Sequence, residues 1–153
     1  MASDAQWRVA TSAVHLLHRA SHKADSVFLQ TAGAFITPRQ FIILAAVAEK
    51  PGVTQNAIVE DTGIDRSSVA ELMQKLAKRG LLRRRRKKKD ARAYAVRLTA
   101  DGQEALRRLL PAAREADSAI LGGTDEQLIK LLGRLLNARA KDRPGRAFND
   151  WQK

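Results

Sequence analysis

The sequence predicts a mainly α-helical fold with one small β-hairpin, as a single domain over residues 1–153. Capping boxes, in which a hydroxyl residue is followed three positions later by Gln, mark helix starts at Ser3, Thr37 and Thr124. Apolar residues then recur at intervals of three and four, which is the period of one helix face. Over residues 94–98 the interval falls to two, which is the period of a β-strand.

The first predicted helix runs from about Asp4 to Thr31 and carries a narrow seam. The seam consists of Trp7, Ala10, Val14, Leu17, Ser21, Ala24 and Phe28. At ~1.5 Å per residue, a helix of this length spans roughly 42 Å. Because a domain of this size cannot cover such a length, we expect part of the seam to pack against a second copy of the chain.

The remaining elements follow from local start and stop signals. Helices are predicted at Pro38 to Lys50, at 55–61 after a cap at Thr54, at Arg66 to Arg79 after a cap at Asp65, at 100–121 after a cap at Thr99 with a kink at Pro111, and at Asp125 to Ala140. The last helix is expected to bury Leu128, Ile129, Leu132, Leu135 and Leu136. The segment before Thr99 is expected to form a hairpin with its tip near Lys89 to Arg92.

Positive charge is concentrated in one stretch of the chain. The net charge is +12, and residues 79–97 hold ten basic residues against one acidic residue. Seven of the basic residues are consecutive, from Arg83 to Lys89, and they repel one another. A surface that meets phosphate groups accounts for such a run better than a solvated loop does, so the stretch predicts binding to nucleic acid.

The short helix over 55–61, the break at Thr62-Gly63, the capped helix over 66–79 and the basic hairpin together predict a winged helix-turn-helix. The exposed face of the helix over 66–79 is expected to carry Arg66, Ser67, Ser68, Glu71, Gln74, Lys75 and Lys78. A recognition helix enters the major groove by its N-terminal end, where Arg66 could read guanine and the serines could bind bases or phosphates. In the alternative interpretation, Asp65 and Ser68 only cap the helix and Arg66 is solvated.

The segment TQNAIVEDTGIDRSSVAELMQKLAKRGLLRRRRKKKDARAYAVRLTADG, residues 54–102, resembles the central block of the MarR family of winged-helix regulators. The most specific part is Asp90-Ala-Arg92, followed by Leu98-Thr99 and Gly102. The resemblance implies a winged helix-turn-helix lobe at 37–99, a helical dimerisation region at 4–33 and 100–140, and a loose C-terminal tail at 141–153. It also implies a homodimer that regulates transcription, by default as a repressor, on a pseudo-palindromic operator in double-stranded DNA.

The resemblance further implies which residues bind DNA. Residues that match Thr54 and Gln55 contact phosphates in the family, and an arginine that matches Arg92 enters the minor groove. An aspartate that matches Asp90 holds the turn of the wing. The expected DNA-binding set is Thr54, Gln55, Arg66, Ser67, Ser68, Glu71, Lys75, Arg84, Arg86, Lys88, Asp90 and Arg92.

A ligand site is a further expectation, because many members of the family hold a small aromatic acid or phenol. All three histidines, His15, His18 and His22, lie on one flank of the first helix, and Arg19 adjoins them. They could bind the carboxylate of an aromatic effector, with Phe41 as an apolar wall. The flank could instead be solvated, bridge a dimer or hold a metal ion, and no metal site is assigned.

Other classes of function are disfavoured. The chain has no cysteine, no phosphate-cradling glycine loop and no long apolar run, so we expect no enzyme, no cofactor and no contact with a membrane. The N-terminal residues lack the pattern of a secretory signal, which indicates a cytoplasmic protein. Two alternatives stay open: an architectural protein indifferent to DNA sequence, suggested by the dense wing, and a winged helix that binds RNA or protein.

Overall fold

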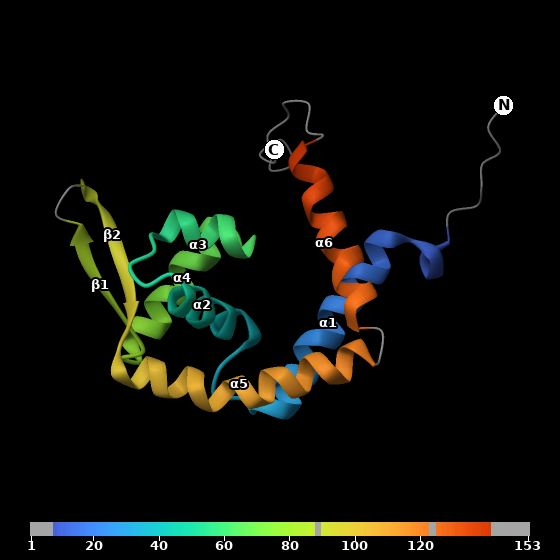
Figure 1. The fold of residues 1–153 in the computed structure, drawn as a ribbon, viewed down its shortest axis with the longest axis horizontal. Helices are drawn as coiled ribbons and strands as arrows, with labels where there is room; N and C mark the ends of the chain where they lie inside the picture. Colours follow the sequence, from blue (N-terminus) through green and yellow to red (C-terminus); the bar gives the residue numbers. More distant parts are fainter. Residues whose placement is uncertain (1–7, 88–89, 123–124, 142–153) are drawn as a thin grey trace. The chain divides into compact units, whose positions relative to one another are not determined.

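The computed structural model describes residues 8–87, 90–122 and 125–141 (Figure 1). The chain divides into two compact units, Met1–Asp117 and Ser118–Lys153. Its elements are a 3-10 turn η1 (Val9–Thr11), α1 (Ala13–Ala32), α2 (Pro38–Glu49), α3 (Gln55–Thr62), α4 (Arg66–Lys78), β1 (Leu82–Lys87), β2 (Asp90–Leu98), α5 (Ala100–Leu121) and α6 (Asp125–Lys141). This architecture confirms the predicted fold class. None of the described helices is long and apolar enough to span a membrane.

The predicted start of the first helix at Asp4 is wrong. Residues 4–7 lie outside the described part, and α1 begins only at Ala13, after η1. Ser12 has extended backbone angles (φ −71°, ψ 121°), and its hydroxyl accepts the N–H of His15 at 3.4 Å. A serine that caps α1 in this way competes with continuation of the helix toward the N-terminus.

The core of the first unit forms where α2, α3 and α4 pack against the base of the hairpin and α5. The fully buried side chains are Ile36, Ile43, Leu44, Val47, Ile58, Val69, Met73, Leu76 and Val96. Each of the helices α1 to α5 begins after a residue whose side chain accepts an N–H of the first turn. At α2, Thr37 and Gln40 form the predicted capping box, with both reciprocal hydrogen bonds present.

The hairpin is antiparallel, with Leu82 opposite Leu98, Arg84 opposite Val96 and Arg86 opposite Tyr94. Lys87 pairs with Asp90, so the strands are joined by residues 88–89 and the predicted tip near Lys89 to Arg92 lies too far along the chain. The cause is a register shift after Arg86, which leaves three residues of β2 between consecutive partners. At the other end, Val96 exchanges backbone hydrogen bonds with the turn after α2, at Gly52 and Val53 (2.8 and 2.9 Å).

The apolar face of α6 was predicted to be buried, and this prediction is wrong within one chain. Ile129, Leu132, Leu135 and Leu136 are 58, 39, 45 and 74% exposed. Leu128 is half-buried. In the first unit, Val14 and Leu17 of the α1 seam are also exposed. Each of the two helices thus exposes several large apolar side chains, and contiguous apolar surface of this kind is typical of a face that meets another molecule.

The start of α5 packs very closely on the segment that leads into the hairpin. The Thr99 N–H donates to the Leu81 carbonyl at 3.1 Å, and the Thr99 hydroxyl donates to the Gly80 carbonyl at 2.5 Å. One turn later Gly102 is buried, and a Cβ atom there would lie 2.0 Å from the Leu81 carbonyl oxygen. Only glycine therefore allows this approach of helix and hairpin base.

Gly102→Ala is expected to destabilise the protein by about 1–3 kcal/mol or more, because the new methyl group overlaps a backbone carbonyl that cannot move alone. Gly133→Ala in α6 is the matched control, since nothing lies within 4 Å of its Cβ position. That variant should be neutral or more stable by up to ~1 kcal/mol, from helix propensity. Urea unfolding measures both, and equal stability of the two variants would contradict the close approach.

Candidate nucleic-acid interface

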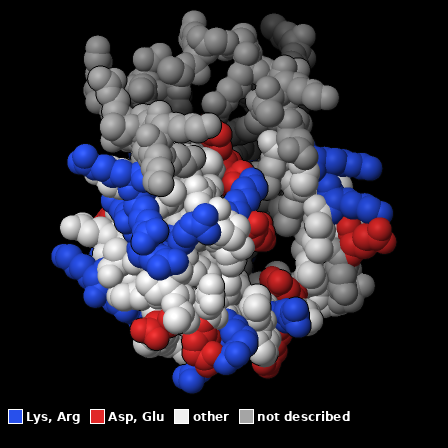
Figure 2. Space-filling model, turned by 60° about the vertical axis from the view of Figure 1, so that its left-hand side comes forward, with Lys and Arg blue, Asp and Glu red and all other residues white. Residues whose placement is uncertain are grey.

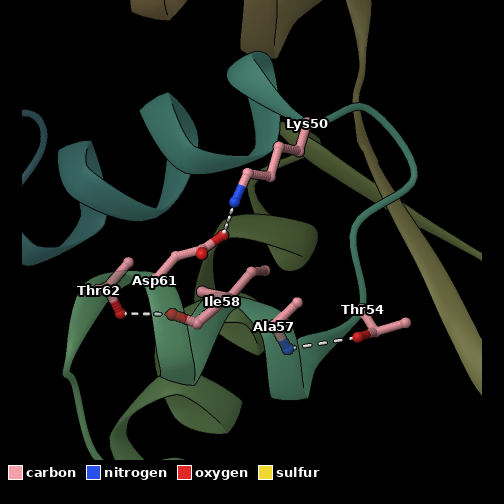
Figure 3. Close-up of polar contacts among 6 residues, drawn as sticks. All are labelled: Lys50, Thr54, Ala57, Ile58, Asp61 and Thr62. Atoms are coloured by element: carbon pink, nitrogen blue, oxygen red, sulfur yellow. Dashed lines mark hydrogen bonds and ion pairs between the residues drawn. The ribbon is translucent and has the colours of Figure 1, made fainter. Parts of the chain in front are cut away.

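Local hydrogen bonds set the geometry of α3 and of the turn that follows it. The Thr54 hydroxyl accepts the Ala57 N–H at 3.3 Å and caps α3 (Figure 3). At the other end, the Thr62 hydroxyl donates to the Ile58 carbonyl at 2.6 Å and accepts the Ile64 N–H at 3.3 Å. Gly63 takes a left-handed conformation (φ 68°), which turns the chain sharply into the residue that caps α4.

An ion pair joins α3 to the end of α2. Lys50 Nζ lies 2.7 Å from Asp61 Oδ2, as Figure 3 shows. Both side chains are well exposed, so the pair stabilises the fold by only ~0–1 kcal/mol. The orientation of α3 therefore depends mainly on buried Ile58, and the ion pair adds little to it.

The N-terminus of α4 is organised by one carboxylate. Asp65 Oδ1 accepts the Ser67 hydroxyl at 2.6 Å and the Ser68 N–H at 2.9 Å. These hydrogen bonds, that of Ser67 foremost and then those of Ser68, hold the pKa of Asp65 well below its ordinary value of 3.8. Asp65 caps the helix, as both interpretations of the sequence predicted, and Arg66 is exposed beside the cap.

The two sides of α4 differ as predicted. Val69, Met73 and Leu76 are buried, and Leu72 is half-buried. The opposite side is exposed, and on it Glu71 and Lys75 pair with each other (Oε1 to Nζ, 2.6 Å). Of the predicted set, Arg66, Ser67, Glu71 and Lys75 are thus exposed on one helix, with Ser68 half-buried behind the cap.

The wing presents its basic residues on two faces. Arg84 and Arg86 share the face of Val96 and Tyr94, because these residues are cross-strand partners. Arg86 Nε donates to the Tyr94 hydroxyl at 3.2 Å, and its guanidinium lies 5.8 Å from the ring centroid. Figure 2 shows several Lys and Arg side chains close together on one side of the view. Lys88 lies outside the described residues, and so do the side chains of Asp90 and Arg92, which belong to β2.

One contact at this lobe was missed by sequence reasoning. Arg79 Nη1 donates to the Phe35 carbonyl at 2.8 Å, and the guanidinium lies 4.2 Å from the Phe35 ring centroid. The contact ties the C-terminal end of α4 to the loop after α1. No periodicity or spacing signals a pair of residues 44 positions apart.

The residues predicted to hold an effector are only partly brought together. His18 Nε2 and His22 Nε2 lie 3.0 Å apart, with the rings edge to face, while His15 is half-buried and Arg19 is exposed. Phe41 packs against Phe28 (ring centroids 5.2 Å apart) and lines an open groove of about 450 Å³ on α2 and α3. Among the described residues, no hydrogen bond or ring contact joins Phe41 to the α1 set, and no group of three acidic or histidine side chains could hold a metal ion.

Known proteins share both the lobe and the helices around it. A profile of the MarR family matches residues 36–93. Transcriptional regulator HosA of Escherichia coli O111:H- is 29% identical over 133 residues, which is 80% of this chain and 98% of HosA. Among solved structures, the PcaV transcriptional regulator of Streptomyces coelicolor in complex with its natural ligand is 30% identical, with a TM-score of 0.80 over 88% of this chain and 99% of PcaV. The transcriptional repressor CouR bound to a 23-mer DNA duplex is 26% identical, with a TM-score of 0.72 over 87% of this chain and 95% of CouR.

Asp65→Ala is expected to lower the melting temperature at neutral pH, because the first N–H groups of α4 lose their acceptor. A carboxyl group whose pKa is lowered by folding stabilises the fold fully above its ordinary pKa of 3.8, and this contribution is lost as the pH falls below that value. The difference in melting temperature between wild type and Asp65→Ala should therefore become smaller in acid. Asp65→Asn, which keeps an acceptor but does not titrate, is the control, and a gap that stays constant with pH would contradict the role of the carboxylate. Thermal unfolding over a pH series measures this difference in melting temperature.

Proposed function

The chain belongs to the MarR family and is a DNA-binding transcriptional regulator, and we propose that it acts as a homodimeric repressor on a pseudo-palindromic operator. One observation carries the proposal: the exposed N-terminus of α4, capped by Asp65, and a basic hairpin belong to one lobe, and this lobe resembles that of DNA-bound CouR. CouR is a repressor by name, and occupation of a promoter is the simplest way in which such a lobe lowers transcription.

In the proposed complex, α4 enters the major groove by its first turn. Arg66 offers a forked donor that suits guanine O6 and N7. The Ser67 hydroxyl gives its proton to Asp65, so toward DNA it acts as an acceptor. The Thr54 hydroxyl accepts from Ala57, and its own proton can still go to a phosphate oxygen, as can the amide of neighbouring Gln55.

The wing contributes mainly charge in this proposal. Arg84, Arg86 and Lys88 neutralise phosphates, while Arg92 reaches a minor groove that A·T pairs make narrow and more negative. Asp90 holds the turn of the wing at the start of the strand that carries Arg92. Lys75 has to break its ion pair with Glu71 before it can reach a phosphate. Lys75 therefore adds less to the DNA affinity than a lysine without a partner would.

The exposed apolar faces of α1 and α6 support a homodimer built from the terminal helices and α5. Two-fold symmetry of the protein would then require two half-sites about one helical turn apart, ~10 base pairs centre to centre. The same helices would set the spacing of the two α4 helices, so a ligand held beside them could change DNA affinity. PcaV binds a natural ligand, and we propose a small aromatic acid for this chain, held by His15, His18 and Arg19 near Phe41.

Arg66→Ala is expected to cost ~1–3 kcal/mol on the preferred operator and to relax the specificity at one base position. The operator is obtained by selecting bound fragments from genomic DNA, and fluorescence anisotropy on that operator and on scrambled DNA gives both affinities. Lys78→Ala is the control, because it also removes one positive charge from α4 but at the exposed C-terminal end and outside the first turn. A double change of Arg84 and Arg86 to Gln should instead weaken binding to all sequences and flatten the salt dependence. If Arg66→Ala lowers the affinity equally for the operator and for scrambled DNA, then Arg66 contacts a phosphate and does not read a base.

Sedimentation at micromolar concentration is expected to show about 34 kDa, twice the mass of the 16.9 kDa chain. Leu132→Glu/Leu136→Glu should give a monomer, because four charges would be buried across a two-fold interface. Tyr94→Glu, which alters an exposed ring on the hairpin, is the control and should remain a dimer. A monomeric wild type would contradict the proposal, and so would a double variant that still dimerises with unchanged affinity.

A further inference from the structure

An open cavity of about 260 Å³ lies where the end of α2, the base of the hairpin and α5 meet. Its apolar wall includes Leu98 of β2 and Leu106 and Leu110 of α5. Its basic wall consists of Arg83 of β1, Arg97 of β2 and Arg107 of α5. None of its lining residues comes from α1, α3 or α4, so the cavity is separate from both the DNA-reading helix and the α1 histidines.

Three arginines line the cavity, and no acidic residue does. Arg83 and Arg97 are directly opposite each other in the hairpin, an arrangement that places two like charges on neighbouring strands and is unfavourable. Neither arginine side chain forms a hydrogen bond or an ion pair with another described residue, although the two backbones are paired in the hairpin. The Arg107 side chain pairs with Glu104, and Glu104 also pairs with Arg108. An anion in the cavity would relieve this repulsion.

The guanidinium of Arg97 lies beside the turn that follows α2. Its Nη2 atom lies 3.4 Å from the position that a Cβ atom on Gly52 would occupy. Gly52 has a φ of 90° and hydrogen-bonds to the Val96 carbonyl, so the turn is fixed on the strand that carries Arg97. The fixed turn therefore limits on one side the positions that the Arg97 guanidinium can take when it binds a ligand.

We propose that this cavity binds a small organic acid. Its carboxylate would lie between Arg83 and Arg97, because a guanidinium matches a carboxylate with two parallel hydrogen bonds. Its apolar body would lie against Leu98, Leu106 and Leu110. The apolar wall favours an organic acid over the sugar-phosphate backbone of DNA, which presents no comparable apolar group to Leu106 or Leu110.

The probe is naphthalene-2-carboxylate, titrated by calorimetry into the full-length protein. It should bind saturably with a Kd of about 1 mM or tighter, the range that a ligand of this size reaches. Naphthalene-2-carboxamide, which has the same shape without the charge, and inorganic phosphate, which has charge without the apolar body, should each bind about tenfold more weakly.

Two double variants with equal loss of charge locate the site. Arg83→Gln/Arg97→Gln should weaken naphthalene-2-carboxylate binding by about tenfold or more, since both charged hydrogen-bond donors are lost. Arg85→Gln/Arg108→Gln is the matched control, because it changes exposed arginines of β1 and α5 that do not line the cavity, and it should bind like wild type. Melting temperatures check that both variants are folded.

Other outcomes would overturn the proposal. Equal weakening by the two variants would mean unspecific attraction to a basic surface, and no saturable binding would mean no site. Loss of binding only in His15→Ala/His18→Ala would place the acid on the α1 flank, and would support the effector site proposed there. If the cavity variant binds DNA more weakly than its control and wild type binds no acid, the arginines contact phosphates instead.

Discussion

The fold of the DNA-binding lobe depends on the backbone contact between Leu81 and the first turn of α5. The Leu81 carbonyl accepts the Thr99 N–H, and Gly102 leaves the space that this carbonyl occupies. Leu81 lies three residues after the end of α4 and directly before β1, while Thr99 directly follows β2. A single contact therefore fixes where the recognition helix ends, where both strands of the wing begin and end, and where α5 starts.

Hydrogen bonds between neighbouring segments connect this contact with the candidate DNA-binding surface and set the geometry of that surface. Val96 pairs with Val53, which places the cap of α3 against the hairpin. Gly63 and Asp65 then determine the direction in which α4 starts. Because these constraints involve the backbone, the charged side chains on α4 and on the wing need no partner to be positioned, and they stay exposed for DNA.

The sequence predicted the parts that are decided locally. The helices capped by Thr37, Thr54 and Asp65 begin where predicted, because a cap involves residues only three positions apart. The tip of the hairpin was misplaced, since its register depends on pairing across the strands. Likewise the Arg79 contact with Phe35 and the three-arginine cavity join segments that are distant in the sequence, and local signals could not show that the apolar side chains of α6 are exposed.

The register of the hairpin also limits how many residues of the basic run can contact DNA together. A strand points alternate side chains to opposite faces, so consecutive arginines of β1 cannot all meet one DNA backbone. Arg84 and Arg86 share the face of Tyr94, whereas Arg83 lies opposite Arg97 on the other face, beside the cavity. Both faces add to the long-range potential that attracts DNA, since they lie within roughly one Debye length of each other. Direct contact is restricted to one face at a time, so the dense run is compatible with a wing that still places one arginine in a groove.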